Sequence, residues 1–137
     1  ESDMTYRAVR CILDLKGRYL LAVHNNYLPE TIGKWGLPGG HIETGEAFEV
    51  TAEREMFEEF GLSLSDWQEV ADYPYRGFLQ KVLATKYEGS EAITHDPKEI
   101  LKLAWYSLED IEGMHHADKL HTGFELEAIT SYRTLKQ

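Results

Sequence analysis

Short segments rich in apolar and β-branched residues recur along the chain, separated by clusters of Gly, Pro, Asn and Asp. This pattern predicts β-strands over residues 5–13, 18–24, 35–37, 69–75, 78–87 and 100–106. Residues 14–17, which read Asp-Leu-Lys-Gly, are expected to join the first two strands as a hairpin turn. Polar loops are expected over residues 25–33 and 89–98.

Helical segments alternate with these strands. Residues 47–60 form an acidic helical run, and Gly61 is expected to end it in the left-handed conformation. Ser107 can cap a short helix that follows it. Thr122 and Glu125 have the spacing of a capping box, which predicts a last helix to about residue 135. Its apolar positions recur at three-residue spacing and are expected to face the core: Leu126, Ile129 and Tyr132.

Composition and charge limit the classes of protein to which the chain can belong. It has 137 residues, 42% of them hydrophobic, which predicts one globular domain over residues 1–137. The net charge of −10 argues against binding of long nucleic acid, which needs a basic surface. There is no apolar run of membrane-spanning length, no recognisable signal peptide and one cysteine, so the cytoplasm is the expected compartment. Whether residues 1–3, which precede Met4, are native is left open.

The acidic helical run concentrates carboxylates on one face. Glu55, Glu58 and Glu59 lie within about a 100° arc of an ideal helix because they are three and four residues apart. Like charges at these spacings destabilise a helix, and a hard divalent cation bound through oxygen ligands compensates them. A solvated acidic surface is the alternative interpretation. Arg54 is expected either to form a surface ion pair with Glu58 or to orient a neighbouring carboxylate.

A glycine-rich segment precedes this helix. Residues 34–40 read Lys-Trp-Gly-Leu-Pro-Gly-Gly, and glycine permits positive φ and close approach of the backbone to a ligand. A Pro-Gly-Gly run is ordinarily a turn. Directly before an acidic helix, it can instead direct a backbone carbonyl at a cation. Glu46 lies half a rotation from Glu55 on an ideal helix, so any role for it is expected to come from the loop.

Residues 40–62 match the pattern G-x5-E-x7-R-E-U-x-E-E-x-G-U at every fixed position, where U is an apolar residue. This is the signature of the Nudix hydrolases, and the chain resembles that family. Residues 35–40 resemble the segment that usually precedes this motif in the family. Residues 99–111 resemble a later strand of the family and the start of the helix that follows it. The resemblance implies an α+β Nudix fold, which is an α/β/α sandwich with a mixed β-sheet and the motif as a loop–helix–loop.

The resemblance also implies roles for individual residues. Members of the family bind Mg²⁺ or Mn²⁺, and the implied metal-site residues of this chain are Gly39, Gly40, Glu55, Glu58 and Glu59. Arg54 would orient Glu55 or Glu58. The acid that activates the water differs among members. It is either a glutamate of the motif or an acid on a later loop, for which Glu99 is the candidate; an exposed loop carboxylate is the alternative reading of Glu99.

The implied reaction is hydrolysis of a diphosphate linkage in a small nucleotide. A nucleoside triphosphate, oxidised ones included, is the preferred substrate, with release of a nucleoside monophosphate. One alternative is a nucleoside diphosphate sugar, including ADP-ribose, although Pro74 lies closer to the motif than the proline that helps mark ADP-ribose hydrolases. The other alternative is a non-catalytic module that senses a nucleotide. No membrane partner is expected, and a homodimer is compatible with the sequence.

Several aromatic residues can stack on a base, although most aromatic residues of a small domain belong to its core. Trp35 and Tyr27 are the candidates for substrate binding, and three further candidates are Tyr73, Tyr75 and Phe78. Three histidines near the last helix do not have the spacing of a zinc site: His115, His116 and His121. Among them, His121 is placed where it could contact a substrate.

Overall fold

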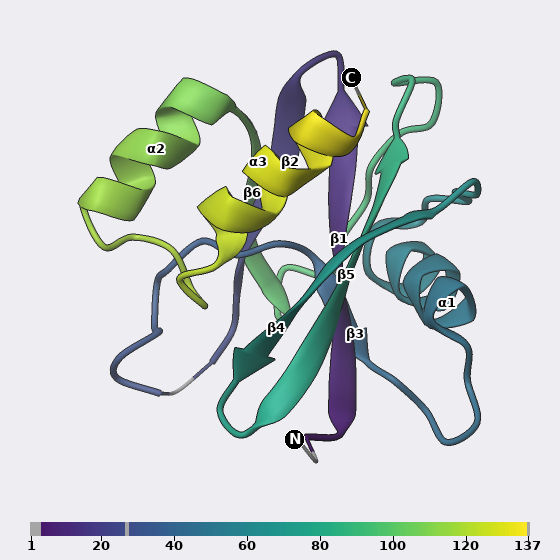
Figure 1. Cartoon of the computed structure of the whole chain (residues 1–137). Helices are drawn as coiled ribbons and strands as arrows, with labels where there is room; N and C mark the ends of the chain where they lie inside the picture. The colour runs from purple at the N-terminus through teal and green to yellow at the C-terminus, as the bar shows by residue number, and fades with distance from the viewer. Residues whose placement is uncertain (1–3, 27, 137) are drawn as a thin grey trace.

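A computed structural model describes residues 4–26 and 28–136 of the chain. The elements in chain order are β1 (Tyr6–Leu15), β2 (Arg18–His24), β3 (Gly39–His41), α1 (Phe48–Phe60), β4 (Gln68–Tyr75), β5 (Phe78–Lys86), β6 (Ile100–Ser107), α2 (Leu108–His116) and α3 (Glu125–Leu135). Figure 1 shows the strands gathered between the helices. The predicted helices and most predicted strands are confirmed within one or two residues at their ends.

The strands form a mixed sheet in the order β4-β5-β1-β2-β6, and β3 pairs with β1 outside this path. β1 and β5 are parallel, whereas the other pairs are antiparallel. The parallel pair brings residues about 70 positions apart in the chain into one row, since Ala8 lies opposite Gln80 and Arg10 opposite Val82. This central pairing matters for function because Arg7 and Arg10 of β1 and Phe78 and Gln80 of β5 then line the same cavity.

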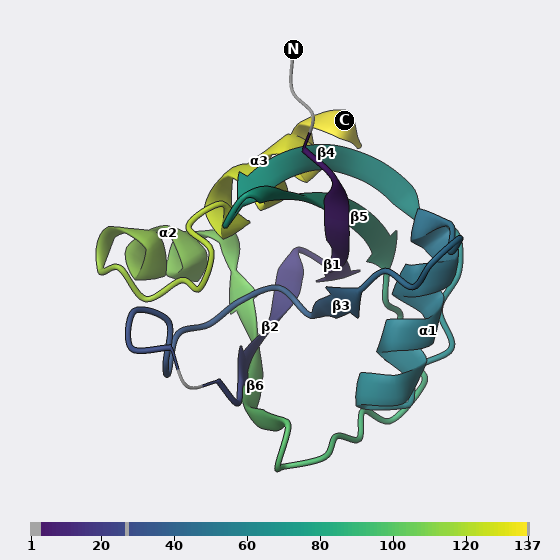
Figure 2. The ribbon, with the colours of Figure 1, turned by 90° about the horizontal axis from the view of Figure 1, so that it is seen from below.

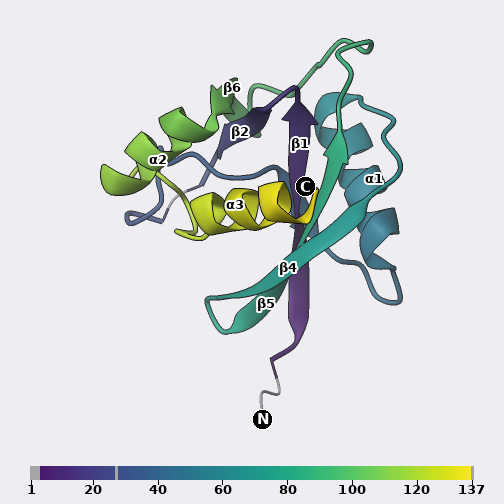
Figure 3. The ribbon, with the colours of Figure 1, turned by 45° about the horizontal axis from the view of Figure 1, so that its top comes forward.

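Helices cover both faces of the sheet (Figures 1 and 2). On one face, α1 packs through Ala52, Met56 and Phe60 against alternate residues of β1, β2 and β5. On the other face, α2 and α3 form a second apolar cluster with the opposite set of strand residues, and α3 crosses in front of β1 (Figure 3). The period of two along each strand divides the apolar residues between the faces. The structure therefore has the expected helix–sheet–helix layers.

Two hairpins of this sheet turn through two residues each. In the first hairpin, β1 continues to Leu15, and Lys16 and Gly17 turn the chain with φ of 51° and 88°. The sequence predicted that this strand ends two residues earlier, because aspartate is a common turn residue. In the structure Asp14 is a buried strand residue, and its side chain accepts a hydrogen bond from Gly17 N in the turn. Arg76 and Gly77 make the corresponding turn between β4 and β5, with φ of 52° and 83°.

Two local predictions are wrong in detail. The short strand predicted over residues 35–37 is present only as isolated bridges at Trp35 and Gly36, and the paired strand is β3. The last helix begins at Glu125 with Phe124 as its N-cap. Half of the predicted capping box is present, since Thr122 N donates to Glu125 Oε2, but Thr122 Oγ1 accepts from Phe124 N and not from Glu125 N. Ser107 does form the predicted capping box of α2.

No helix of the described residues is long and apolar enough to cross a membrane.

Candidate functional site

Arg54 on α1 forms hydrogen bonds with several acidic side chains of the motif. Its guanidinium binds both oxygens of Glu46, with Nε–Oε2 and Nη2–Oε1 distances of 2.7 and 2.9 Å. Nη1 also donates to Glu55 at 2.9 Å and to Glu58 at 3.1 Å. Hydrogen bonds from Arg54 hold the pKa of Glu46 down at about 2. Arg54 thus ties the loop before α1 to two of the predicted metal-site glutamates.

Glycine is required where the loop passes these glutamates. A Cβ at Gly40 would lie 2.2 Å from the carboxyl carbon of Glu55. Gly39 has a φ of 151°, and a Cβ there would lie 2.1 Å from Val9 O on β1. The backbone of residues 39 and 40 therefore lies against Glu55 on one side and against β1 on the other.

Glu59 is the one of the three glutamates with a buried carboxylate oxygen that has no partner among the described residues. Its side chain is 14% exposed, as is that of Glu55, and the unpaired oxygen is Oε1. Burial and the neighbouring charge of Glu55 raise the pKa of Glu59 to about 8, although Arg10 and a hydrogen bond from the Gly39 backbone oppose the rise. A buried carboxylate with an unpaired oxygen is unfavourable unless a cation or a proton compensates it.

His24, at the end of β2, faces this carboxylate. His24 Nε2 lies 3.8 Å from Glu59 Oε2, and it is buried without a hydrogen-bond partner among the described residues. Burial, together with the charge of Arg10, lowers the pKa of His24 to about 4, so the imidazole is neutral near pH 7. The two side chains form a buried polar pair at the edge of a cavity.

The segment that carries Glu99 reaches the same region. Asn25 N donates to Glu99 O at 2.8 Å, which fastens the start of β6 to the end of β2. The charge of Glu99 contributes to the raised pKa of Glu59. The side chain of Glu99 is exposed, as is that of Asp96. Glu99 is therefore close enough to Glu59 to act on it electrostatically.

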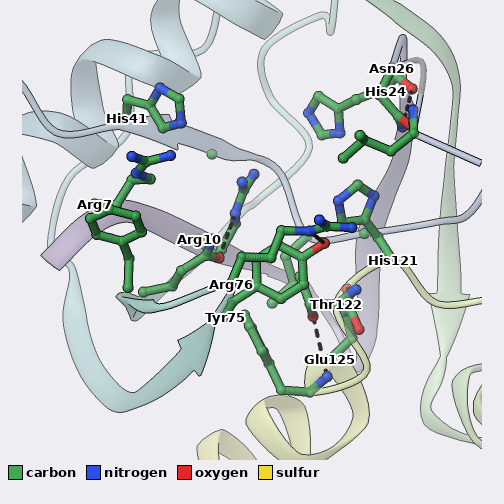
Figure 4. Close-up of a pocket in the computed structure, with 18 of the residues that line it drawn as sticks. Arg7, Arg10, His24, Asn26, His41, Tyr75, Arg76, His121, Thr122 and Glu125 are labelled. Carbon is green, nitrogen blue, oxygen red and sulfur yellow. Dashed lines mark hydrogen bonds between the residues drawn. The ribbon is translucent and has the colours of Figure 1, made fainter. Parts of the chain in front are cut away.

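A cavity of about 480 Å³ opens beside the glycine loop. It is lined by the backbone at Gly39 and Gly40 and by basic side chains from several elements, including Arg7, Arg10, His24, His41, Arg76 and His121 (Figure 4). A basic cavity in a chain with a net charge of −10 is suited to an anionic ligand. The acidic helix and this cavity lie next to each other, since the glycine backbone contacts both.

The β4–β5 hairpin supplies the aromatic rim of the cavity. Tyr75 and Phe78 flank the two-residue turn and line the cavity, as the hairpin register places them opposite each other. The guanidinium carbon of Arg7 lies 3.8 Å from the centre of the Phe78 ring. Tyr75 faces His121 at a centroid distance of 6.0 Å. These rings can contact the planar part of a ligand.

Among the described residues, no three His, Cys, Asp or Glu side chains form a ready-made group for a metal ion. The residues present nevertheless fit a hard divalent cation. Glu59 Oε1 is buried and unpaired, and Glu55 and Glu58 each give one oxygen to Arg54. Carboxylate and carbonyl oxygens are the ligands that Mg²⁺ and Mn²⁺ prefer.

The sequence matches the NUDIX domain family over residues 4–124. The chain belongs to the Nudix family. Its curated relatives include the NAD-capped RNA hydrolase NudC of Citrobacter koseri, which is 31% identical over 74 residues. That match spans 53% of this chain but only 28% of the relative. The first relatives are thus much longer than the matched segment.

Solved structures confirm the Nudix fold. The NUDIX domain of Shewanella oneidensis NrtR, solved in complex with ADP ribose, has a TM-score of 0.78 and 20% identity. The similarity covers 99% of this chain and 91% of that domain. The MutT protein of Methanosarcina mazei Go1 has a TM-score of 0.71 and 22% identity, with complete coverage of both chains. The α+β class with a mixed sheet is therefore confirmed.

The structure brings most of the predicted Nudix site residues together. Glu55, Glu58, Glu59 and Arg54 lie beside the loop of Gly39 and Gly40, and the start of β6 carries Glu99 toward them. Trp35 does not line the cavity and instead packs edge-on against Tyr106. Tyr27 lies outside the described residues.

The other aromatic and histidine candidates separate into two groups. Tyr75, Phe78 and His121 line the cavity. Tyr73 is stacked on Phe124 in the core, and the exposed pair His115 and His116 lies on α2.

Sequence reasoning identified His121 but missed the other basic side chains of this cavity. Arg10 had a visible signal, because it is a charged residue within the apolar run Ala-Val-Arg-Cys-Ile of β1. Glu46 was expected to act only from the loop, and there it forms the closest contact of Arg54. No local signal identified His24 or Arg76, because their partners, Glu59 and Glu30, are distant from them in the sequence.

Proposed function

We propose that the protein is a metal-dependent pyrophosphohydrolase that cleaves a diphosphate linkage in a small nucleotide. The observation that carries this proposal is the carboxylate of Glu59, which has a buried oxygen without a hydrogen-bond partner among the described residues and lies 3.8 Å from His24, a residue that lines the basic cavity. A cation stabilises a carboxylate in that setting, and an anion suits the basic cavity near it. A phosphorylated ligand with a divalent cation satisfies both requirements.

Glu55, Glu58 and Glu59 would hold Mg²⁺ or Mn²⁺, with backbone oxygen at Gly39 or Gly40 as a further ligand. When bound, the cation would neutralise phosphate charge and lower the pKa of water. Arg54 keeps Glu55 and Glu58 in place through its hydrogen bonds, and Glu46 in turn holds Arg54. This arrangement gives the site a fixed geometry before any ligand binds.

The base that accepts the proton of the attacking water has two candidate locations. One is a glutamate of α1, for which Glu55 and Glu58 are available. The other is Glu99, whose charge already acts on Glu59. Water is the nucleophile in this proposal, so no covalent intermediate with the protein is involved. Comparison of Glu58→Gln and Glu99→Gln tests which carboxylate is the base.

The first candidate substrate is a nucleoside triphosphate, including one with an oxidised base, which would release a nucleoside monophosphate. The aromatic rim of Tyr75 and Phe78 can receive a base, while the basic side chains of the cavity receive the phosphates. Stacking and apolar contacts discriminate between bases by only about 1–3 kcal/mol. Activity on several nucleotides is therefore expected.

The comparisons favour a second candidate. NudC relatives are named for NAD-capped RNA, and the Shewanella neighbour was solved with ADP ribose. Both ligands contain a diphosphate that joins a nucleoside to a second group. A nucleoside diphosphate linked to a sugar, including ADP-ribose, is thus an alternative substrate for this chain.

A substrate screen with Mg²⁺ tests the proposal. ATP, oxidised triphosphates, ADP-ribose and nucleotide sugars should include at least one good substrate, whereas AMP and simple phosphate esters should be inert. Binding of these nucleotides without any turnover would favour the non-catalytic sensing module. Hydrolysis of phosphate esters, with every diphosphate left intact, would contradict the proposal. Cytoplasmic location and a homodimer stay predictions that need separate measurement.

A further inference from the structure

Arg10 occupies the middle of the cavity on β1, the strand that pairs with both β3 and β5. Its neighbours Val9 and Cys11 are fully buried, whereas its own half-buried side chain points into the cavity (Figure 4). An arginine within an apolar strand is expected only where its charge has a partner or a function.

The guanidinium of Arg10 has a hydrogen-bond partner but no carboxylate. Nε donates to Gln80 Oε1 on β5 at 3.0 Å. Among residues 4–26 and 28–136, no carboxylate forms a salt bridge with Arg10. By contrast, Arg54 on α1 is paired with several glutamates, and Arg76 is paired with an exposed one. Arg10 therefore brings a positive charge into the cavity that none of these carboxylates neutralises at close range.

Glu125, the one carboxylate among the described residues that lines the cavity, does not provide this partner. Glu125 is fully buried, and its two oxygens accept hydrogen bonds from Thr122 N and Gly123 N, each at 2.9 Å. These bonds fix Glu125 at the start of α3. Glu125 therefore leaves Arg10 without a salt bridge inside the cavity, and an anionic ligand can supply one.

The charge of Arg10 acts on both sides of the cavity. After burial, it is the next contributor to the lowered pKa of His24 and of His121, which are both about 4. It also opposes the effect of burial that raises the pKa of Glu59. Arg10 is thus close enough to Glu59, His24 and His121 to influence their pKa values, and the two histidines, which are neutral near pH 7, add no charge to the cavity.

We propose that Arg10, oriented by Gln80, is a substrate-binding residue whose two NH₂ groups contact phosphate oxygens of the nucleotide's diphosphate. Gln80 occupies only the Nε–H group, which leaves the forked end of the guanidinium facing the cavity. A planar fork matches phosphate geometry and makes paired, charge-assisted hydrogen bonds. This inference rests on the proposed function and adds a contact that holds the diphosphate independently of the cation.

Binding of ADP to the metal-free protein tests this role. In EDTA at low ionic strength, calorimetry should detect ADP binding to the unmodified protein, and Arg10→Met should weaken it at least about tenfold. Arg10→Lys keeps the charge but loses the fork, so its affinity should be intermediate. Gln80→Glu should also weaken binding, because the new carboxylate would neutralise Arg10. The control is Arg18→Met, which changes an exposed arginine of β2 outside the cavity and should leave affinity unchanged.

The outcomes separate this inference from the proposed function. If Arg10→Met fails to fold, the ADP affinities of Arg10→Lys and Gln80→Glu are compared with that of the unmodified protein. Equal ADP affinity in the folded Arg10 variants and the unmodified protein would overturn the role of Arg10, as would no ADP binding to the unmodified protein up to millimolar concentration. If the protein hydrolyses diphosphates but these substitutions leave its ADP affinity unchanged, only the present inference is contradicted. A protein that binds ADP through Arg10 and hydrolyses no diphosphate contradicts only the proposed function.

Discussion

Gly40→Ala should remove most of the hydrolytic activity and leave the fold intact. The added Cβ would lie 2.2 Å from the carboxyl carbon of Glu55, whereas an ordinary van der Waals contact begins at 3.4 Å. The carboxylate must therefore retreat by about 1.2 Å, which is the difference between these two distances. That movement would also strain the 2.9 Å hydrogen bond between Arg54 and Glu55.

The expected loss of rate follows from the displacement of the Glu55 carboxylate. A misplacement of about 1 Å at a reacting site can lower the rate by about 10²-fold. This rate factor corresponds to about 2.7 kcal/mol of lost transition-state stabilisation. The free energy of unfolding should change little, because the obstructing atoms are the end of a flexible side chain and the φ of Gly40 is not in the left-handed region.

The assay is kcat/KM for Mg²⁺-dependent hydrolysis of ATP and ADP-ribose, measured together with thermal unfolding. Gly113→Ala is the matched control, since a Cβ there meets nothing within 4 Å and its position on α2 is helical. This control should keep full activity and gain up to about 1 kcal/mol of stability. A folded Gly40→Ala protein with the activity of the unmodified protein would refute the proposed role of the Glu55 position.

Three further predictions concern other contacts. Glu59→Gln should abolish most of the rise in melting temperature that millimolar Mn²⁺ causes in the unmodified protein, as measured by thermal unfolding. Glu46→Gln should lower the free energy of unfolding by about 1–3 kcal/mol and reduce turnover, because Arg54 loses its two-point contact. A denaturant titration with unchanged stability would contradict this. Asp14→Asn should cost stability at pH 7 but much less at a pH below the folded-state pKa of Asp14, which lies under the ordinary aspartate value of 3.8. Burial raises the pKa of Asp14, but hydrogen bonds from Tyr132, Gly17 and Lys136 outweigh it and lower the pKa in the folded state. Its contribution is therefore present above the unfolded pKa and is lost as pH falls through the folded one. An equal cost at both pH values would show that the charge of Asp14 is not involved.

Tertiary pairing decided which side chains share the cavity. Arg10 and Gln80 are hydrogen-bonded only because β1 and β5 are parallel neighbours, and no local pattern specifies that pairing. The same is true of His24 beside Glu59. The isolated bridges at residues 35 and 36 likewise depend on partners at Ala22 and Leu120. Trp35, a predicted substrate-binding residue, contacts Tyr106, which lies 71 residues further along the chain.

The sequence by itself determined the elements whose causes are local. The acidic helix, its glycine end at Gly61 and the Ser107 capping box follow from spacing within a few residues, and the structure contains all three. The motif over residues 40–62 likewise identified the family, because its glycines and glutamates meet through neighbouring turns of one loop–helix unit. Tertiary structure alone decided the basic cavity. Its side chains come from strands and loops as far apart as Arg7 and His121, and burial then set their charge states. Long-range pairing and desolvation depend on the assembled sheet, and neither can be read from neighbouring residues.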